Sequence, residues 1–210
     1  MKIIELDNIT KKYQRNKVLC DLSYCFYKGY YYILVGENGC GKSTLIKSIL
    51  GLVKIDSGKI IVNTTNVAYI PENISFPEFI TVHDFLINIG LIRGIPKSVL
   101  EERILRLLSE WKIESAKNKP MSYLSKGMHQ KVLIIQALLR NSDLYLFDEP
   151  LNGLDNYMKN KVIETIAELK EQKKTVLVIT HYPEYYQNKS DIIIKLENGK
   201  LCENLNQVSL

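Results

Sequence analysis

Short apolar runs alternate with amphipathic stretches of helical period along the whole chain. Two of the runs, Leu144–Phe147 and Val176–Ile179, are uninterrupted, which is typical of central strands covered on both faces. This alternation predicts an α/β domain with a mainly parallel sheet. The expected strands are Lys2–Leu6, Val18–Phe26, Tyr31–Val35, Lys59–Val62, Val67–Ile70, Leu144–Phe147, Val176–Ile179 and Ile192–Leu196.

Near the N-terminus the apolar positions follow a period of two. Leu22, Tyr24 and Phe26 alternate with other residues, as expected for an antiparallel strand with one exposed face. We therefore expect an N-terminal antiparallel β subdomain in addition to the parallel sheet.

Between about residues 74 and 140 the apolar positions follow helical periods instead. Pro96 lies near the start of one expected helix, where its fixed φ and missing N–H are tolerated. This segment predicts a helical subdomain inserted between strands. No repeat, low-complexity tract or linker divides the chain, so residues 1–210 are expected to form one domain. The expected helices are Val82–Leu91, Lys97–Ser109 and Ser125–Leu139, followed outside the insertion by Asn156–Gln172.

Composition narrows the class of protein. The chain is 46% hydrophobic and 24% charged, which is typical of a globular protein. The formal charge of +5 comes from lysines interleaved with acids, so no nucleic-acid partner is expected. Apolar stretches such as Val132–Leu139 are shorter than the roughly 20 residues of a membrane span. Acidic residues stand near the N-terminus, where a signal peptide would be apolar. We expect a cytoplasmic protein that reaches a membrane only through a partner.

The four cysteines lack zinc-site spacing and are expected to be free thiols.

A glycine-rich segment follows the expected strand Tyr31–Val35 and opens a helix near residues 43–50. The pattern G-x-x-x-x-G-K-[ST] is matched from Gly36 to Ser43. Glycines let successive backbone N–H groups point into one concavity that binds phosphate oxygens, and the helix N-terminus adds partial positive charge. Lys42 can reach the β- and γ-phosphates, and the Ser43 hydroxyl can ligate Mg²⁺. The segment predicts binding of a nucleoside triphosphate.

Two carboxylates, Asp148 and Glu149, end the apolar strand Leu144–Phe147. A buried strand would carry them to the carboxyl edge of the sheet, where ligands of open α/β folds bind. Asp148 could there hold hydrated Mg²⁺, and Glu149 could take a proton from a water that attacks the γ-phosphorus. Taken alone, the same residues are equally compatible with a solvated acidic turn.

The segment Leu124–Val132, Leu-Ser-Lys-Gly-Met-His-Gln-Lys-Val, resembles the signature segment of ABC ATPases. The phosphate loop, Asn152–Asp155 and His181 occur with it in the order and spacing of that family. The resemblance covers essentially the whole chain. It implies a P-loop NTPase core, ATP hydrolysis, and two subunits that enclose two nucleotides.

The resemblance also implies roles for single residues. Tyr13 corresponds to the aromatic residue that stacks on adenine, and Asp155 to the loop that couples the two sites of a dimer. Ser125 and Gly127 would contact the γ-phosphate held by the opposite subunit. The implied catalytic residues are Glu149, His181 and Lys42. The implied nucleotide-binding residues are Tyr13, Gly36, Asn38, Gly39, Cys40, Gly41, Lys42, Ser43, Thr44, Ser125, Gly127 and Asp155; those for Mg²⁺ are Ser43, Asp148 and Glu72.

Three positions depart from the usual pattern or invite a second interpretation. The signature reads Leu-Ser-Lys-Gly-Met rather than Leu-Ser-Gly-Gly-Gln, a version that resembles a branch dominated by exporters. Glu72 stands where the family usually has Gln; a carboxylate can still ligate Mg²⁺ and should make activity more dependent on the metal. Cys40, inside the phosphate loop, is either a small tolerated residue or a redox-sensitive thiol.

The resemblance implies an ATPase subunit that powers a membrane transporter, an exporter in preference to an importer, through ATP-driven dimer closure. Its partners would be a membrane-spanning subunit on a separate chain and a second ATP-binding subunit, identical or related. A helix of the membrane partner would dock near Glu72, Phe76, Phe79 and Ile80. The alternative is a membrane-free ABC ATPase with soluble partners, for example in cofactor assembly. A sensor that binds nucleotide without turnover is disfavoured because Lys42, Asp148, Glu149 and His181 are all present.

Overall fold

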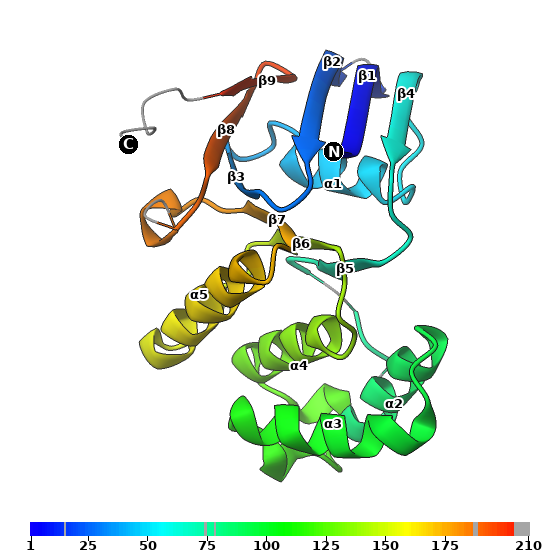
Figure 1. The fold of residues 1–210 in the computed structure, drawn as a ribbon, viewed down its shortest axis with the longest axis vertical. Helices are drawn as coiled ribbons and strands as arrows, with labels where there is room; N and C mark the ends of the chain where they lie inside the picture. The colour runs from blue at the N-terminus through cyan, green and yellow to red at the C-terminus, as the bar shows by residue number, and fades with distance from the viewer. Residues whose placement is uncertain (15, 74, 78, 187–188, 204–210) are drawn as a thin grey trace. The chain divides into compact units, whose positions relative to one another are not determined.

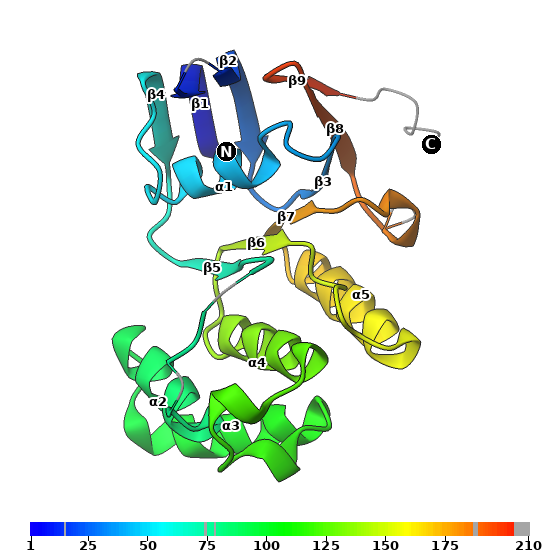
Figure 2. The ribbon, with the colours of Figure 1, turned by 180° about the vertical axis from the view of Figure 1, so that it is seen from behind.

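The computed structural model describes residues 1–14, 16–73, 75–77, 79–186 and 189–203. The chain divides into two compact units (Figures 1 and 2). The first unit comprises Met1–Val67, Asp143–Glu149 and the chain from Ile163 onward, and the second comprises Ala68–Ser142 and Pro150–Val162. Residue 74, where the predicted helical insertion begins, lies outside the described residues.

An antiparallel sheet forms one part of the first unit. Its strands are β1 (Lys2–Tyr13), β2 (Asn16–Tyr27) and β4 (Ser57–Val62), in the order β2-β1-β4. β1 is longer than the predicted Lys2–Leu6 because its register shifts between Leu6 and Ile9. Such a bulge breaks the period of two that the sequence pattern relied on, although both Leu6 and Ile9 are buried. The predicted antiparallel arrangement is confirmed, and the predicted end of the first strand is wrong.

A second sheet in the same unit consists mainly of parallel strands, in the order β6-β7-β3-β8-β9 among the strands of this unit. The central strands β6 and β7 are buried along their whole length. β9 was not predicted, although the Asn198-Gly199 pair is a sequence signal for a two-residue hairpin turn. In the structure these two residues join β8 to β9, with φ of 50° and 74°. The strands are β3 (Tyr31–Val35), β6 (Leu144–Asp148), β7 (Thr175–Ile179), β8 (Ile192–Glu197) and antiparallel β9 (Lys200–Glu203).

The helices lie within a residue or two of their predicted bounds. α1 (Lys42–Ile49) follows β3 in the first unit and buries Leu45, Ile46 and Ile49. α5 (Asn156–Glu171) leads into β7, and a short 3₁₀ turn, η3 (Pro183–Tyr185), follows it. Among the described residues, none of the helices has both the length and the apolar character needed to cross a membrane.

The second unit is mainly helical. Its core is built by apolar side chains such as Leu86, Leu100, Ile104 and Val132, all at 0% exposure. Thr81 caps α2 by accepting a hydrogen bond from Asp84 N at 3.0 Å. After β5 (Val67–Ile70), which begins at the end of the first unit, its elements are α2 (Val82–Ile92), α3 (Lys97–Glu110), η1 (Glu114–Ala116), η2 (Met121–Tyr123) and α4 (Lys126–Leu138).

Candidate functional site

The segment Gly36–Gly41 forms a tight loop between β3 and α1. The Nζ of Lys42 is folded into it and donates to the carbonyl oxygens of Gly36 at 2.7 Å and Glu37 at 2.9 Å. Gly41 precedes α1 in the left-handed region, with φ of 111°, and contributes no side-chain cap. A Cβ at this position would stand 2.6 Å from Val18 Cγ1, so the close approach to β2 requires glycine. The first N–H groups of α1 are thus left to bind an anion such as phosphate.

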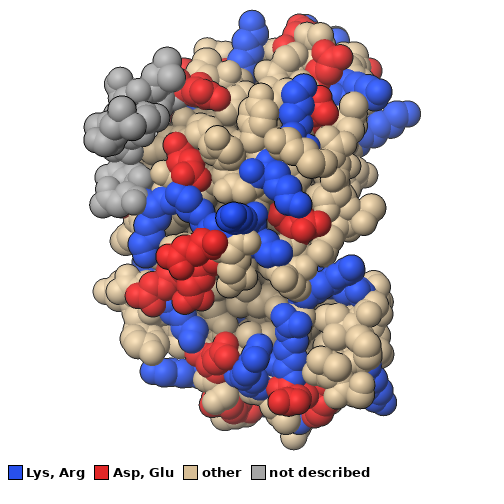
Figure 3. All heavy atoms as spheres, in the orientation of Figure 1, with Lys and Arg blue, Asp and Glu red and all other residues tan. Residues whose placement is uncertain are grey.

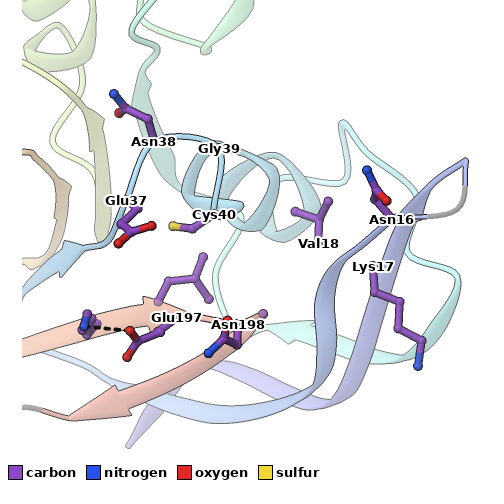
Figure 4. A pocket seen from close by; sticks show the side chains of 12 residues that line it. Asn16, Lys17, Val18, Glu37, Asn38, Gly39, Cys40, Glu197 and Asn198 are labelled. Atoms are coloured by element: carbon purple, nitrogen blue, oxygen red, sulfur yellow. Dashed lines mark ion pairs between the residues drawn. The ribbon is translucent and has the colours of Figure 1, made fainter.

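A polar cavity of about 520 Å³ adjoins this loop. In Figure 4, Glu37 and Cys40 of the loop face Glu197 and Asn198 of the β8–β9 hairpin across it. The hairpin is tied to β2 by a hydrogen bond from Cys20 N to Gly199 O of 2.9 Å. The complete lining is Asn16, Lys17, Val18, Glu37, Asn38, Gly39, Cys40, Lys195, Leu196, Glu197, Asn198 and Gly199.

Tyr13, the predicted adenine-stacking residue, lies next to this cavity. It is the last residue of β1 and the cross-strand partner of Asn16, which lines the cavity. Its side chain is 47% exposed, so one part of the ring is open to a ligand. The ammonium group of Lys11 lies 5.2 Å from the centre of the ring. The stacking of this ring on adenine stays a prediction.

Three parallel strands bring the remaining residues of the first unit to the same sheet edge. Asp148 at the end of β6 pairs with Ile179 at the end of β7, and Ile179 pairs in turn with Leu34 of β3. The residues that follow these strands are Glu149, Thr180 and the start of the phosphate loop. Because the register is continuous across all three strands, the phosphate loop and the acidic pair converge at the carboxyl edge of the sheet.

Glu149 and His181 face one another at this edge. The Nε2 of His181 lies 3.6 Å from Oε1 of Glu149. Glu149 is 5% exposed, and its backbone N–H donates to Ile179 O at 3.0 Å. Asp148 is 2% exposed. The solvated acidic turn that the sequence left open is therefore wrong for these two residues, because both carboxylates are buried.

Behind this edge, η3 is followed by Tyr186, which is fully buried. Burial raises the pKa of Tyr186 above its usual value, and the neighbouring Tyr31 and the charge of Glu149 raise the pKa further. The phenol therefore stays neutral at any physiological pH.

The residues predicted to contact the opposite nucleotide, and Asp155, predicted to couple the two sites, lie in the second unit. Ser125 caps α4 by accepting a hydrogen bond from Met128 N at 3.3 Å. Asp155 stands at the start of α5 and accepts from Met158 N at 2.9 Å. Gly127 packs so closely on the loop before α5 that a Cβ would meet Gly153 O at 2.5 Å. The signature segment and the Asn152–Asp155 loop are thus held against one another.

The proposed magnesium ligands fall into two groups. Ser43, in the first turn of α1, and buried Asp148 offer a hydroxyl and a carboxylate oxygen, the hard donors that Mg²⁺ prefers. This donor chemistry fits a hydrated Mg²⁺ bound with the phosphates. Glu72 belongs to the second unit, where it is exposed, and its contact with the metal stays a prediction.

Sequence reasoning did not single out several residues of the site. Val18 and Asn16 line the cavity from β2, and Lys11 contacts Tyr13. Gln130, 5% exposed, donates from Nε2 to Pro150 O at 3.0 Å and so joins the signature helix to the loop after the acidic pair. Lys11 carried no signal in the sequence, because the predicted strand ended at Leu6 and the register of β1 shifts between Lys11 and Lys12. The other contacts depend on tertiary packing.

Comparison with known proteins identifies the family. The family model described as "ABC transporter" matches residues 19–152. The chain belongs to this family. As an ABC ATP-binding domain it binds ATP and hydrolyses it, and the predicted P-loop NTPase fold is confirmed.

Relatives of this ABC ATP-binding domain include two proteins of Bacillus subtilis. The uncharacterized ABC transporter ATP-binding protein YthP is 37% identical over 187 residues, which are 89% of this chain and 79% of that protein. The manganese transport system ATP-binding protein MntB is 34% identical, over 95% of this chain and 85% of that protein. A solved structure of an ATP-binding subunit of an ABC transporter superposes with a TM-score of 0.89 at 30% identity, covering 96% of this chain and 89% of that one.

Proposed function

We propose that this chain drives a membrane-spanning transporter subunit, carried on a separate chain, by binding and hydrolysing ATP as one half of a closed dimer. The observation that carries the proposal is the convergence of the phosphate loop, Asp148, Glu149 and His181 at one sheet edge. Such a set can hold a triphosphate, bind its metal and activate a water, which are the three requirements of phosphoryl transfer to water.

ATP would lie along the phosphate loop, with its base towards Tyr13. Lys42 donates to two loop carbonyl oxygens. When ATP binds, Lys42 would replace at least one of these hydrogen bonds by contacts with the β- and γ-phosphates. The backbone N–H groups at the start of α1 would bind the phosphate oxygens. Ser43 and Asp148 would hold Mg²⁺, which balances the negative charge of the phosphates when bound.

Glu149 would accept the proton of the attacking water. Its buried carboxylate lies at the end of β6, with Nε2 of His181 3.6 Å from its Oε1. The His181 ring would contact the γ-phosphate and keep the attacking water in line. In the closed dimer, the corresponding signature residues of the second ATP-binding subunit, which are Ser125 and Gly127 if that subunit is identical, would complete the site from the opposite side, with Asp155 linking the two sites.

The membrane partner would dock near Glu72 in the second unit. Phe79 there is 90% exposed, and Phe76 packs edge-on against Phe85 at a ring-centroid distance of 5.3 Å. On the face shown in Figure 3, Lys and Arg side chains are interspersed with Asp and Glu. The chain would act at the inner face of the membrane.

We place it among exporters on the resemblance of Ser125–Met128 to their signature. Deleting its gene should then make the cargo accumulate inside cells rather than outside.

Glu149→Gln tests the proposal most directly. The amide keeps the shape of the side chain but cannot accept the proton, so hydrolysis should fall roughly 100- to 10,000-fold while ATP binding is retained. The variant should accumulate as an ATP-bound dimer, measured by size-exclusion chromatography with and without Mg²⁺-ATP. Normal hydrolysis by this variant would show that Glu149 is not the base.

A further inference from the structure

We propose that Lys11 is a positioning residue for the nucleobase: its ammonium group holds the Tyr13 ring in the orientation that stacks on adenine. The inference rests on the proposed function, in which Tyr13 is the stacking residue. It assigns to Lys11 a role that acts through the ring of Tyr13 and through no direct contact with ATP.

The ammonium group of Lys11 is fixed in place by neighbouring residues. Its Nζ donates to the carbonyl oxygen of Lys54 at 2.7 Å and lies 3.8 Å from Oδ1 of Asp56. The Lys11 side chain is only 14% exposed, unusually low for a lysine on a small sheet. A freely solvated lysine would make neither contact, so the positive charge occupies one defined position.

That position is over the ring of Tyr13. The Nζ lies 5.2 Å from the centre of the ring, within the range of cation–π attraction. Lys11 and Tyr13 are two residues apart on β1, and the register against β2 shifts between Lys11 and Lys12, so the contact itself and not the strand period places the charge over the ring. A cation held over one face of an aromatic ring leaves the opposite face for a flat base.

Tyr13 needs such a restraint because its own surroundings provide little. It ends β1, it is 47% exposed, and the next residue, Gln14, has a left-handed φ of 54°. An exposed ring at a strand end can sample several rotamers, and stacking on adenine would have to select one of them. Restraining the ring beforehand lowers the conformational entropy that is lost on binding.

The backbone under Tyr13 is held by the same acid that faces Lys11. Oδ2 of Asp56 accepts a hydrogen bond from Lys12 N, and Asp56 N donates to Thr10 O at 2.8 Å. Asp56 therefore fixes both the strand end and the charge above the ring. Replacing Asp56 would disturb both, so the test replaces Lys11 itself.

The experiment compares ATP with inorganic tripolyphosphate, which has the phosphates but no base. Lys11→Met keeps the length of the side chain and removes the charge; Lys11→Gln is a second uncharged variant, and Lys11→Arg retains the cation. Lys12→Met, which removes the charge of the exposed neighbour, is the matched control. The dissociation constant of each ligand is measured by calorimetry with Mg²⁺, together with KM and kcat for ATP.

We expect Lys11→Met and Lys11→Gln to weaken ATP binding about two- to tenfold, the range of one cation–π contact. Tripolyphosphate binding and kcat should not change, Lys11→Arg should restore ATP affinity, and Lys12→Met should match the wild type. In a Tyr13→Ala background, Lys11→Met should have no further effect on ATP affinity.

Equal weakening of ATP and tripolyphosphate would overturn the inference, because Lys11 would then act on the phosphates or on the fold. Unchanged ATP affinity in both uncharged variants would overturn it as well, while leaving the proposed function in place. A wild-type protein that binds neither ligand would instead refute the proposed function, and the inference with it.

Discussion

Glu149 has a backbone φ of 51°, in the left-handed region that glutamate rarely adopts. Holding a residue there costs on the order of 1 kcal/mol. Its N–H is bonded to Ile179 O, so the register of β6 with β7 holds the residue in this conformation. The same bond keeps the proposed base close to His181, which follows β7. A strained residue at the sheet edge is therefore maintained by the two strands that position the site.

The side chain of Tyr186 combines a buried ring with a buried hydroxyl. Its hydroxyl is buried and has no hydrogen-bond partner among the described residues. Removing such a hydroxyl costs little, so Tyr186→Phe should change the free energy of unfolding by less than about 1 kcal/mol. Tyr186→Ala, which also removes the ring, should lose about 3–5 kcal/mol. Chemical denaturation of both variants measures the two values. A loss of 2 kcal/mol or more in Tyr186→Phe would contradict the prediction for that variant, and would indicate that the hydroxyl is hydrogen-bonded to a buried water.

The elements of the second unit depend on close contacts that a sequence pattern does not display. Gly127, in the first turn of α4, lies against the carbonyl oxygen of Gly153, and a Cβ at Gly153 would in turn meet the stem of Lys126 at 3.1 Å. Because this contact is with backbone, the loop cannot give way by changing a rotamer. The position of the signature segment therefore depends on the loop that precedes α5.

Gly127→Ala should separate these two elements. The added Cβ would stand 2.5 Å from Gly153 O, which should destabilise the fold by about 1–3 kcal/mol and displace the start of α4. ATP binding to the phosphate loop should remain. ATPase activity should fall roughly 100-fold, because the group proposed to complete the opposite site would be misplaced.

Gly90→Ala is the matched control for this variant. Its Cβ would meet the side chain of Leu100 at 2.4 Å inside the second unit, a contact that a rotamer change of Leu100 can relieve, so it should cost no more stability than Gly127→Ala. Measured per folded molecule, its ATPase activity should stay near the wild-type value. Equal loss of activity in both alanine variants would show that Gly127 affects stability alone.

At the scale of the whole molecule, the proposed transporter role requires a partner in the membrane. Phe79→Asp should abolish co-purification of a membrane protein from detergent extracts and leave ATP binding and stability unchanged, since Phe79 is 90% exposed. Leu52→Asp, at a residue 66% exposed in the first unit, should not affect co-purification. A soluble partner that co-purifies in place of a membrane protein would favour the membrane-free alternative.

Much of the fold followed from local pattern. The central strands β3, β6 and β7 were predicted within one residue, because a buried parallel strand is a continuous apolar run. β1 was underestimated because a bulge resets the alternation at Leu6 to Ile9. β9 was missed because Lys200–Glu203 has few apolar residues and is defined by its pairing with β8.

The sequence alone determined the chemistry that is local: glycines in a loop suited to phosphate, a lysine beside them, and two acids at the end of an apolar strand. These groups work through their own backbone or their immediate neighbours, so a linear pattern is enough to reveal them. Tertiary structure alone decided the rest. Strand register joined His181 to Glu149, and packing set Gly127 against Gly153. The ammonium group of Lys11 lies over Tyr13 because Lys54 and Asp56, more than 40 residues along the chain, hold it there. Such contacts depend on distance in space, which the order of residues does not encode directly.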